Sequence, residues 1–313
     1  MTIYMGSATT SHTAHLTFNR YPITPHPSRL SPHAPKMDII HSVAALRERL
    51  QREPNNVFVP TMGNLHAGHI QLINIAKPRA ACTVVSIFVN RLQFGPREDF
   101  DKYPRTLTAD CAKLEAAGVD VVFAPDEGEI YPEPQTYTVE PPDIQHMLDG
   151  AVRPGHFRGV ATVVLKLFNM VNPHSAIFGK KDYQQCLVLN NMVRQLALPI
   201  EIILAETVRA EDGLALSSRN TYLSADERKE APRLYQMLQK ARDELKSGAR
   251  DYQRVELDVM ADLAHHGWKP DYIAVRRQTD LLPPENGERK LVVLAAARLG
   301  KTRLIDNVEV ERS

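Results

Sequence analysis

Residues 60–69, with the sequence Pro-Thr-Met-Gly-Asn-Leu-His-Ala-Gly-His, combine residue types that can bind a phosphate group. They follow an apolar run that ends at Val59 and precede apolar residues at helical spacing, so we expect a strand, a turn and a helix in that order. A turn that opens a helix points unpaired N–H groups, and about half a positive charge, at the group that lies there. His66 and His69 would share one face of that helix beside the anion, while Gly68 leaves no side chain between backbone and ligand. The segment therefore predicts a nucleotide site.

The two histidines also allow other interpretations. Histidines three residues apart on a helix often cap or pack that helix. A zinc site would need at least one further ligand, which the neighbouring sequence does not offer. On this segment alone, phosphate binding and a purely structural role both stay open.

Two further groups suit phosphate chemistry. Lys181 follows a predicted strand, at the edge where open α/β sheets bind ligands, and its ammonium could neutralise the charge of a transferring phosphate. Ser217, Ser218 and Arg219 offer two hydroxyls and a guanidinium, a set that binds phosphate well. The alternatives are a solvated surface lysine and an ordinary polar turn. Asp182 could cap the next helix or accept a ribose hydroxyl, and the sequence does not separate the two.

The composition limits the classes of function. The chain has 313 residues and a formal net charge of +1, with charged residues mixed along it, which argues against bulk electrostatic binding to nucleic acid or a membrane. No apolar run approaches the ~20 residues that span a bilayer. Cys82, Cys111 and Cys186 lie far apart without CxxC spacing, which predicts core packing in a reducing compartment, with no disulfide framework and no zinc site. We expect a soluble, cytoplasmic protein.

Residues 1–36 contain no Asp or Glu and are rich in Ser, Thr, Pro and His, which predicts a disordered N-terminal extension. A transit peptide is the alternative, but the segment has few fixed positive charges and its prolines would break an amphipathic helix. Met37 could be the true start of the chain, with the first element at residues 39–50.

The alternation of strand-like and helix-like segments from residue 57 predicts an α/β fold, a Rossmann-like parallel sheet with helices on both faces, over a first domain of residues 37–206. The segment 160–171 is rich in β-branched residues, but its apolar positions follow a 3.6-residue period and Pro173 stops it, so we predict a helix. The expected strands are 57–59, 83–89, 119–123, 176–178 and 201–204, and the expected helices are 69–77, 106–117, 160–171 and 183–196.

Residues 207–313 read as a smaller C-terminal α+β domain, joined by a loop that could act as a hinge and let the domain close as a lid. Ser224 and Glu227 form a capping-box pattern that opens a helix, and a second helix runs to Gly267. Strands are expected at 272–276, 291–297 and 302–308.

Five further blocks extend the pattern of residues 60–69, at 85–94, 103–105, 153–160, 178–185 and 212–220. Together they resemble the pantothenate synthetase family of the HxGH nucleotidylyltransferase superfamily, over about residues 37–310. The chain departs from the family at two positions, with Arg91 in place of Pro and Lys180 in place of Glu. Arg91 could alter the loop over the pantoate pocket, and Lys180 could aid ATP binding or face solvent.

The resemblance implies roles for particular residues. Residues 216–219 take the place of the KMSKS loop of class I aminoacyl-tRNA synthetases, and Gln93 and Gln185 become the pantoate ligands, although either glutamine alone would be taken for a surface residue. The implied catalytic residues are His66, His69, Lys181, Ser217, Ser218 and Arg219. The implied ATP contacts are Met62, Gly63, Asn64, Leu65, His66, Ala67, Gly68, His69, Gly179, Lys180, Lys181, Asp182, Val208, Leu216, Ser217, Ser218 and Arg219. The implied contacts to pantoate and β-alanine are Pro60, Met62, Gln93 and Gln185.

The resemblance also implies a reaction in two steps, with ATP as substrate and a Mg²⁺ ion bridging phosphate oxygens. Pantoate would attack the α-phosphorus of ATP to give pantoyl adenylate, and β-alanine would then displace AMP to give pantothenate, without a covalent protein intermediate. A homodimer through the first domain is expected. The alternatives are a nucleotidylyltransferase that makes a dinucleotide-like product, a class I synthetase, for which no tRNA-binding appendix is visible, and an ATP-binding regulator with an inactive site.

Overall fold

Six strands rich in apolar residues pair into an all-parallel sheet in the first domain, as predicted. The computed structural model describes residues 37–53, 55–96 and 98–312, so the disorder predicted for residues 1–36 lies outside the described part of the chain. The strand order across the sheet is β1 (Asp38–Ile40), β4 (Val121–Phe123), β3 (Cys82–Ile87), β2 (Asn56–Thr61), β5 (Ser175–Gly179) and β6 (Glu201–Ala205).

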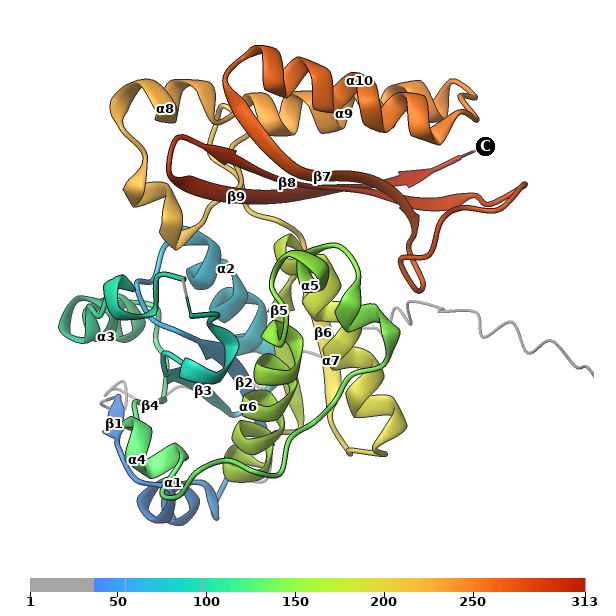
Figure 1. Cartoon of the computed structure of the whole chain (residues 1–313). Coiled ribbons are helices and arrows are strands. Elements are labelled where there is room, and N and C mark those ends of the chain that lie inside the picture. Colours follow the sequence, from blue (N-terminus) through green and yellow to red (C-terminus); the bar gives the residue numbers. More distant parts are fainter. Residues whose placement is uncertain (1–36, 54, 97, 313) are drawn as a thin grey trace, which may run out of the picture.

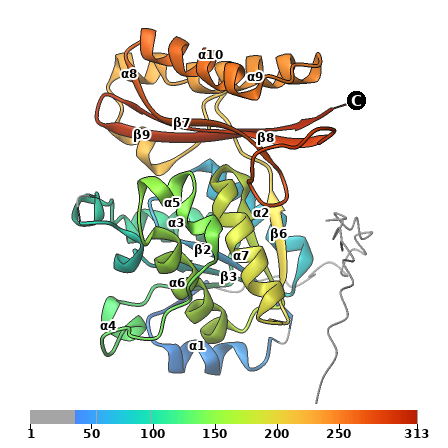
Figure 2. The same cartoon turned by 45° about the vertical axis from the view of Figure 1, so that its right-hand side comes forward.

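Both faces of this sheet are buried because successive residues along each strand alternate between two apolar cores. In β2, Phe58 packs into a core with α1, α6 and α7, whereas Val57 and Val59 pack into a second core with α2 and α3. Helices therefore cover both faces, which confirms the Rossmann-like arrangement (Figure 2). The helices are α1 (Val43–Leu50), α2 (Ala67–Ala76), α3 (Leu107–Ala116), α4 (Glu127–Ile130), α5 (Asp149–Val152), α6 (His156–Val171) and α7 (Tyr183–Gln195).

The order of the strands reverses between β2 and β5. From β2 the chain steps to β3 and then β4 on one side, and the later strands β5 and β6 lie on the other. Open α/β sheets bind ligands at such a switch point, outside the carboxyl ends of the strands. The two segments that leave the sheet there are the turn after β2 and the 3₁₀ helix η5 (Lys180–Asp182) after β5.

The second domain is a three-stranded antiparallel sheet with helices on one face. Figure 1 shows this sheet between the helices α9 and α10 above and the first domain below. Its elements are α8 (Ala225–Glu230), α9 (Arg233–Lys246), α10 (Tyr252–His265), β7 (Trp268–Arg277), β8 (Lys290–Leu299) and β9 (Thr302–Glu311).

The two domains share apolar packing. Along β8, Leu291, Val293 and Ala295 face the helices of the second domain, whereas Val292 and Leu294 join the core of the first domain. The second domain is therefore seated on the first by buried side chains as well as by the connecting loop.

Two of the predicted elements are each divided into two in the structure. The expected first element at 39–50 is a strand and a helix, because Ser42 has extended backbone angles and its hydroxyl accepts a hydrogen bond from Ala45 N at 3.3 Å, which starts α1. The helix expected after the Ser224–Glu227 capping box is two helices, α8 and α9, with Pro232 at the start of the second. The capping box itself is present.

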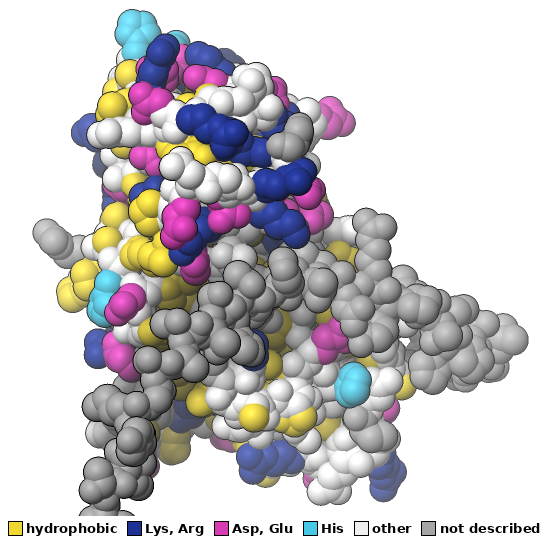
Figure 3. All heavy atoms as spheres, turned by 90° about the vertical axis from the view of Figure 1, so that its right-hand side faces the viewer, with side chains coloured by type: hydrophobic (Ala, Val, Ile, Leu, Met, Phe, Trp, Pro, Cys, Tyr) yellow, Lys and Arg dark blue, Asp and Glu magenta, His cyan; other side chains and the backbone are white. Residues whose placement is uncertain are grey.

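The short 3₁₀ helices connect these elements. Those in the first domain are η1 (Lys77–Arg79), η2 (Arg91–Gln93), η3 (Phe100–Lys102), η4 (Asp143–His146) and η5, and η6 (Ser218–Tyr222) lies in the loop between the domains. Among the described residues, no helix has the length and apolar character needed to cross a membrane. Basic and acidic side chains are interspersed over the face of the second domain shown in Figure 3.

Replacing Gly159 with alanine should destabilise the first domain. Gly159 lies in α6 against η2, and a Cβ atom there would stand 2.1 Å from the carbonyl oxygen of Leu92. Backbone must therefore move, and overpacking of this kind costs about 1–3 kcal/mol. Gly95→Ala is the matched control, because its Cβ would lie 3.7 Å from the nearest atom, on Glu98, in ordinary contact. Urea unfolding would measure both variants, and equal stability of the two would contradict the packing described here.

Candidate active site

The turn after β2 is held in place by a buried carboxylate. Gly63 and Asn64 reverse the chain with φ angles of +81° and +49°. The backbone N–H groups of Asn64 and Leu65 then donate to the two carboxylate oxygens of Asp110, each at 2.8 Å. Asp110 lies on α3 and is fully buried. Two N–H groups of the turn are thus already paired with Asp110, a residue for which no role was predicted from the sequence.

A sequence signal for Asp110 does exist. Asp110 and Leu114 are the two buried residues of α3 and lie four positions apart, so the acid stands on the apolar face of an amphipathic helix. A lone carboxylate in such a place needs hydrogen-bond donors, because burying an unpaired charge costs several kcal/mol.

His66 and His69 form a capping box at the start of α2. Nδ1 of His66 accepts a hydrogen bond from Gly68 N at 3.1 Å, and Nδ1 of His69 accepts one from His66 N at 3.3 Å. Since both Nδ1 atoms are acceptors, a neutral imidazole at either position carries its proton on Nε2. The two histidines therefore do cap the helix, which was one of the interpretations that the sequence left open. Capping leaves their two Nε2–H groups as donors for a ligand.

Both rings are held neutral. Burial, with a smaller contribution from Lys181, lowers the pKa of His66 from 6.5 to about 4. Burial together with the neighbouring His66 lowers the pKa of His69 to about 3. Neutral rings 4.1 Å apart, measured between their centroids, do not repel each other as two imidazolium ions would.

Gly68 is required by the histidine beside it. A Cβ atom at this position would lie 2.8 Å from Cε1 and 2.9 Å from Nδ1 of His66, and 3.8 Å from Cβ of Leu216. Because Gly68 has no side chain, the ring of His66 and the loop that carries Leu216 can both pack against its backbone.

Lys181 stands on η5, at the end of β5 and opposite the histidine pair across the switch point. Its side chain is mostly buried, and its ammonium lies 3.7 Å from a carboxylate oxygen of Asp182. The neighbouring Lys180 points elsewhere, to Glu206 at 2.6 Å and Glu309 at 3.0 Å. Lys180 thus neither faces solvent nor lines the cleft described below.

The loop at 216–219 reaches from the second domain onto the turn after β2. The hydroxyl of Ser218 donates to the carbonyl of Asn64 at 3.1 Å, and the hydroxyl of Ser217 accepts from Arg219 N at 3.3 Å. The Arg219 guanidinium donates from Nε and one Nη to Asp99, at 3.2 and 2.9 Å. The Nη1 donors of Arg219 are not used in that pair.

These groups surround one large cleft of about 1450 Å³, counting its open mouth. It runs from the histidines and Lys181, past the ends of β2 and β3, to apolar side chains of α6. The predicted site residues that line it are Pro60, Met62, His66, Gly68, His69, Gln93, Gly179, Lys181, Asp182, Gln185, Val208, Leu216, Ser217, Ser218 and Arg219. The predicted ATP contacts outside its lining are Gly63, Asn64, Leu65, Ala67 and Lys180.

Gln93 is oriented at the far end of this cleft. Its amide donates to Met62 Sδ at 3.1 Å and accepts from Asn90 Nδ2 at 3.1 Å, while its backbone carbonyl accepts from His156 Nδ1 at 2.8 Å. His156 is buried, with its pKa lowered to about 4 mainly by that burial. Arg91 lies away from the cleft, 3.0 Å from Glu127 and over the Phe100 ring.

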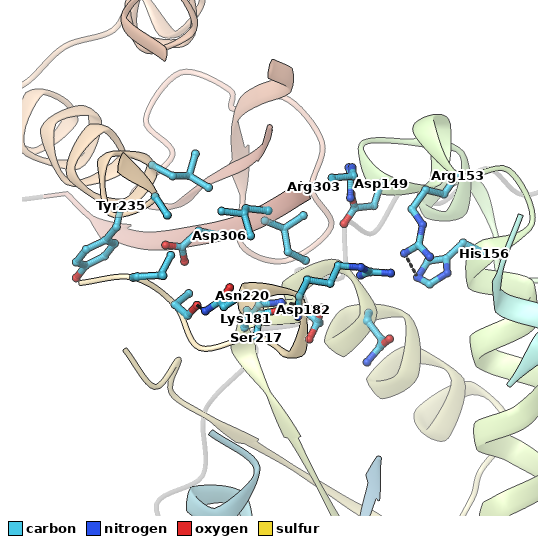
Figure 4. A pocket seen from close by; sticks show the side chains of 18 of the residues that line it. Asp149, Arg153, His156, Lys181, Asp182, Ser217, Asn220, Tyr235, Arg303 and Asp306 are labelled. Atoms are coloured by element: carbon cyan, nitrogen blue, oxygen red, sulfur yellow. Dashed lines mark hydrogen bonds and ion pairs between the residues drawn. The ribbon is translucent and has the colours of Figure 1, made fainter. Parts of the chain in front are cut away.

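A second cavity of about 690 Å³ lies between the domains and joins the cleft. Figure 4 shows Lys181, Asp182 and Ser217 close together there, with Arg153 on one side and Asp306 on the other. Lys181 therefore borders both spaces.

Fold and cleft together define a class. A Rossmann-like sheet with two histidine Nε2–H donors, a lysine and a Ser-Ser-Arg loop around its switch point is an α/β protein built to bind a phosphate-bearing ligand. A family model described as pantoate-beta-alanine ligase matches residues 38–309, so the chain belongs to that family. The resemblance seen in the sequence is confirmed.

Curated relatives carry the name pantothenate synthetase. One from Chromobacterium violaceum is 60% identical over 277 residues, which cover 88% of this chain and 100% of the relative. One from Nitrosospira multiformis is 56% identical over 274 residues, which cover 88% of this chain and 98% of the relative.

Solved structures agree. The crystal structure of pantothenate synthetase from Thermus thermophilus matches with a TM-score of 0.84 and 45% identity, covering 88% of this chain and all of that chain. A pantoate-beta-alanine ligase from Francisella tularensis, solved in complex with beta-gamma ATP and beta-alanine, matches with a TM-score of 0.74 and 34% identity, covering 87% of this chain and 97% of that one.

The histidine pair should make stability depend on pH. In the unfolded chain His69 titrates near 6.5 and in the folded protein at about 3, so below pH 6.5 the unfolded state binds the proton first. The contribution of neutral His69 to the free energy of unfolding is thus fully present above pH 6.5 and is lost as the pH drops towards 3. His69→Gln should weaken this dependence, whereas His265→Gln, at an exposed position, should keep it. Urea unfolding at pH 7 and pH 5 measures the change in unfolding free energy between the two pH values. An equal change in the parent chain and in both variants would contradict a neutral His69.

Proposed function

We propose that this cleft performs the ATP-dependent condensation of pantoate with β-alanine, through a pantoyl-adenylate intermediate, to give pantothenate, AMP and pyrophosphate. The observation that carries the proposal is the layout of one continuous cleft. Its phosphate end has His66, His69 and Lys181, its other end has the amide of Gln93 beside apolar side chains of α6, and Gln185 lines the same cleft. A cleft with these two ends suits an activated nucleotide beside a small hydroxy acid.

In the first step, a carboxylate oxygen of pantoate forms a bond to the α-phosphorus, and the bond from that phosphorus to the bridging oxygen of pyrophosphate breaks. Negative charge spreads onto the phosphate oxygens and the departing pyrophosphate. The Nε2–H donors of His66 and His69 are oriented before the reaction by the capping box, and the ammonium of Lys181 adds a positive charge across the cleft, so together they stabilise this charge with little reorganisation.

Gln93 and Gln185 are the proposed partners of pantoate. A neutral amide bonds hydroxyl and carboxylate oxygens without forming a rigid ion pair, which leaves the carboxylate free to attack. Gln93 is already oriented by Asn90 and Met62. Gln185 lies at the third position of α7 and borders both the cleft and the second cavity.

In the second step the amine of β-alanine attacks the acyl carbon, the amide bond forms, the bond to the phosphate oxygen breaks, and the amine loses a proton as AMP departs. The loop with Ser217, Ser218 and Arg219 covers the phosphate end through its contacts to Asn64 and Asp99. This cover would keep water from the adenylate, which is a reactive mixed anhydride.

A Mg²⁺ ion on the triphosphate fits the residues present. Mg²⁺ in nucleotide sites is held by phosphate oxygens, waters and one or two carboxylates. Asp182 and Glu206 are the carboxylates that line the cleft, and either would supply a ligand to the ion. The ion would neutralise phosphate charge.

A homodimer through the first domain and a cytoplasmic location belong to the same proposal, and light scattering of the purified chain tests the dimer.

The half-reaction tests the proposed function directly. With pantoate and labelled pyrophosphate but no β-alanine, the protein should exchange label into ATP, because adenylate formation is reversible. Omitting pantoate is the control and should abolish exchange. A folded protein that exchanges no label with pantoate present would refute the function.

Lys181 and His69 should act mainly in the first step, where charge develops on phosphate oxygens. Lys181→Ala and His69→Ala should each slow adenylate formation about 100- to 1000-fold, the usual loss for one preorganised donor, with weaker effects on the second step. Single-turnover kinetics from ATP plus pantoate, and from pantoyl adenylate plus β-alanine, separate the steps. Lys229→Ala, at an exposed lysine paired with Asp226, is the control and should change neither. Equal losses of rate in both steps would contradict the role assigned to Lys181 and His69.

A further inference from the structure

The side chain of Lys181 does not fix its own position. Its ammonium makes a single ion pair among the described residues, at 3.7 Å to the adjacent Asp182. It stands on η5, a 3₁₀ helix of only three residues that follows Gly179, a residue with no side chain to cap it. The placement of the ammonium therefore depends on what holds the backbone of η5.

One side chain of the second domain holds that backbone. Nδ2 of Asn307, on β9, donates to the carbonyl oxygen of Lys180 at 2.8 Å and to that of Lys181 at 3.0 Å. Asn307 is buried, and both hydrogens of its amide nitrogen are used in these bonds. Two successive carbonyls are thus fixed from one atom across the boundary between the domains.

Asn307 is itself rigidly placed. Its backbone N–H donates to a carboxylate oxygen of Asp306 at 2.8 Å, and its carbonyl accepts from Arg209 at 3.3 Å. Arg209 in turn donates to both oxygens of Asp306, at 2.6 and 2.8 Å. A second residue of β9, two positions on and on the same face, contacts side chains only: Glu309 accepts from the ammonium of Lys180 at 3.0 Å and from the hydroxyl of Tyr183 at 3.1 Å, and bonds neither carbonyl.

We propose that Asn307 is the positioning residue for Lys181, so that the second domain sets the placement of the phosphate-binding ammonium by fixing the carbonyls of η5. The inference rests on the proposed function of the cleft and adds to it the residue through which the second domain acts on the first step. Asn307 itself borders neither cavity, so it does not touch the reacting atoms.

A purely structural role would give a different result. If Asn307 only joined the domains, its loss would lower stability and affect both half-reactions regardless of the residue at 181. If it positions Lys181, its loss should slow adenylate formation, and this effect should vanish when the ammonium is already gone. A double-mutant cycle separates the two, because independent sites combine within about twofold in rate.

The test uses Asn307→Asp and Asn307→Ala in the full chain, each alone and with Lys181→Ala. The aspartate keeps the shape of asparagine but turns carboxylate oxygens towards two carbonyls, so η5 must shift. A displacement of about 1 Å costs about 100-fold in rate, and we expect that loss in pantoate-dependent pyrophosphate exchange, with a smaller loss for alanine. With Lys181→Ala present, neither change should slow exchange more than about twofold further.

Glu309→Gln is the matched control. It removes a charge from the same face of β9 and weakens the contact to Lys180, but leaves the two carbonyls bonded to Asn307. It should lower the melting temperature while keeping exchange within about twofold of the parent chain. Turnover of pre-formed pantoyl adenylate with β-alanine should change little in every Asn307 variant.

The outcomes are distinct. A parent chain without pantoate-dependent exchange refutes the proposed function. An active parent chain in which Asn307→Asp exchanges label normally, or loses as much with Lys181→Ala as without it, refutes only the positioning role. If the aspartate variant does not fold, the same cycle with Asn307→Ala decides the question.

Discussion

The pairing of β2 with β5 is the constraint on which the site depends. These strands come from distant parts of the chain and are joined in register only at Val57 with Ser175 and Phe58 with Ala176. Because parallel strands end at the same edge, this pairing sets the start of α2 beside η5. The histidine donors and the lysine meet across the cleft for that reason, although more than a hundred residues separate them. The phosphate end of the proposed site therefore combines both segments.

The turn after β2 balances two electrostatic demands. A site for an anionic ligand needs N–H donors, but unpaired donors in a buried turn destabilise the protein without its ligand. The structure resolves this by pairing the N–H groups of Asn64 and Leu65 with Asp110, and those of His66 and Gly68 with the two imidazoles. The donors that the two histidines offer to a ligand are then Nε2–H groups, because Nδ1 of each neutral ring already accepts a hydrogen bond from the turn.

Much of this could be read from the sequence. The β-branched runs and the 3.6-residue period of 160–171 predicted the parallel sheet and α6, and residues 60–69 predicted the strand, turn and helix correctly. Asp110 and Asn307 were missed because their roles depend on contacts with segments that lie 45 and 126 or more residues away. Lys180 and Lys181 are adjacent and chemically alike, so the sequence cannot tell which of them lines the cleft. Only the structure shows that Lys180 pairs with Glu206 and that Lys181 points into the cleft.

The shared core between the domains bears on how the cleft could close. Opening the whole second domain would expose Val292 and Leu294 and would break the pairs from Arg303 to Asp149 and from Lys180 to Glu309. Burial of apolar surface contributes about 25 cal/mol per Å², so such a movement carries a large penalty. The loop at 217–222 is held to the first domain by fewer contacts, chiefly the hydrogen bonds between Ser218 and Asn64, the bond between Ser218 and Tyr103, and the ion pair of Arg219 with Asp99. The second domain is thus packed firmly against the first and bonded to η5 through Asn307, and the predicted closure would cost less free energy if it were confined to the loop that carries Ser217, Ser218 and Arg219.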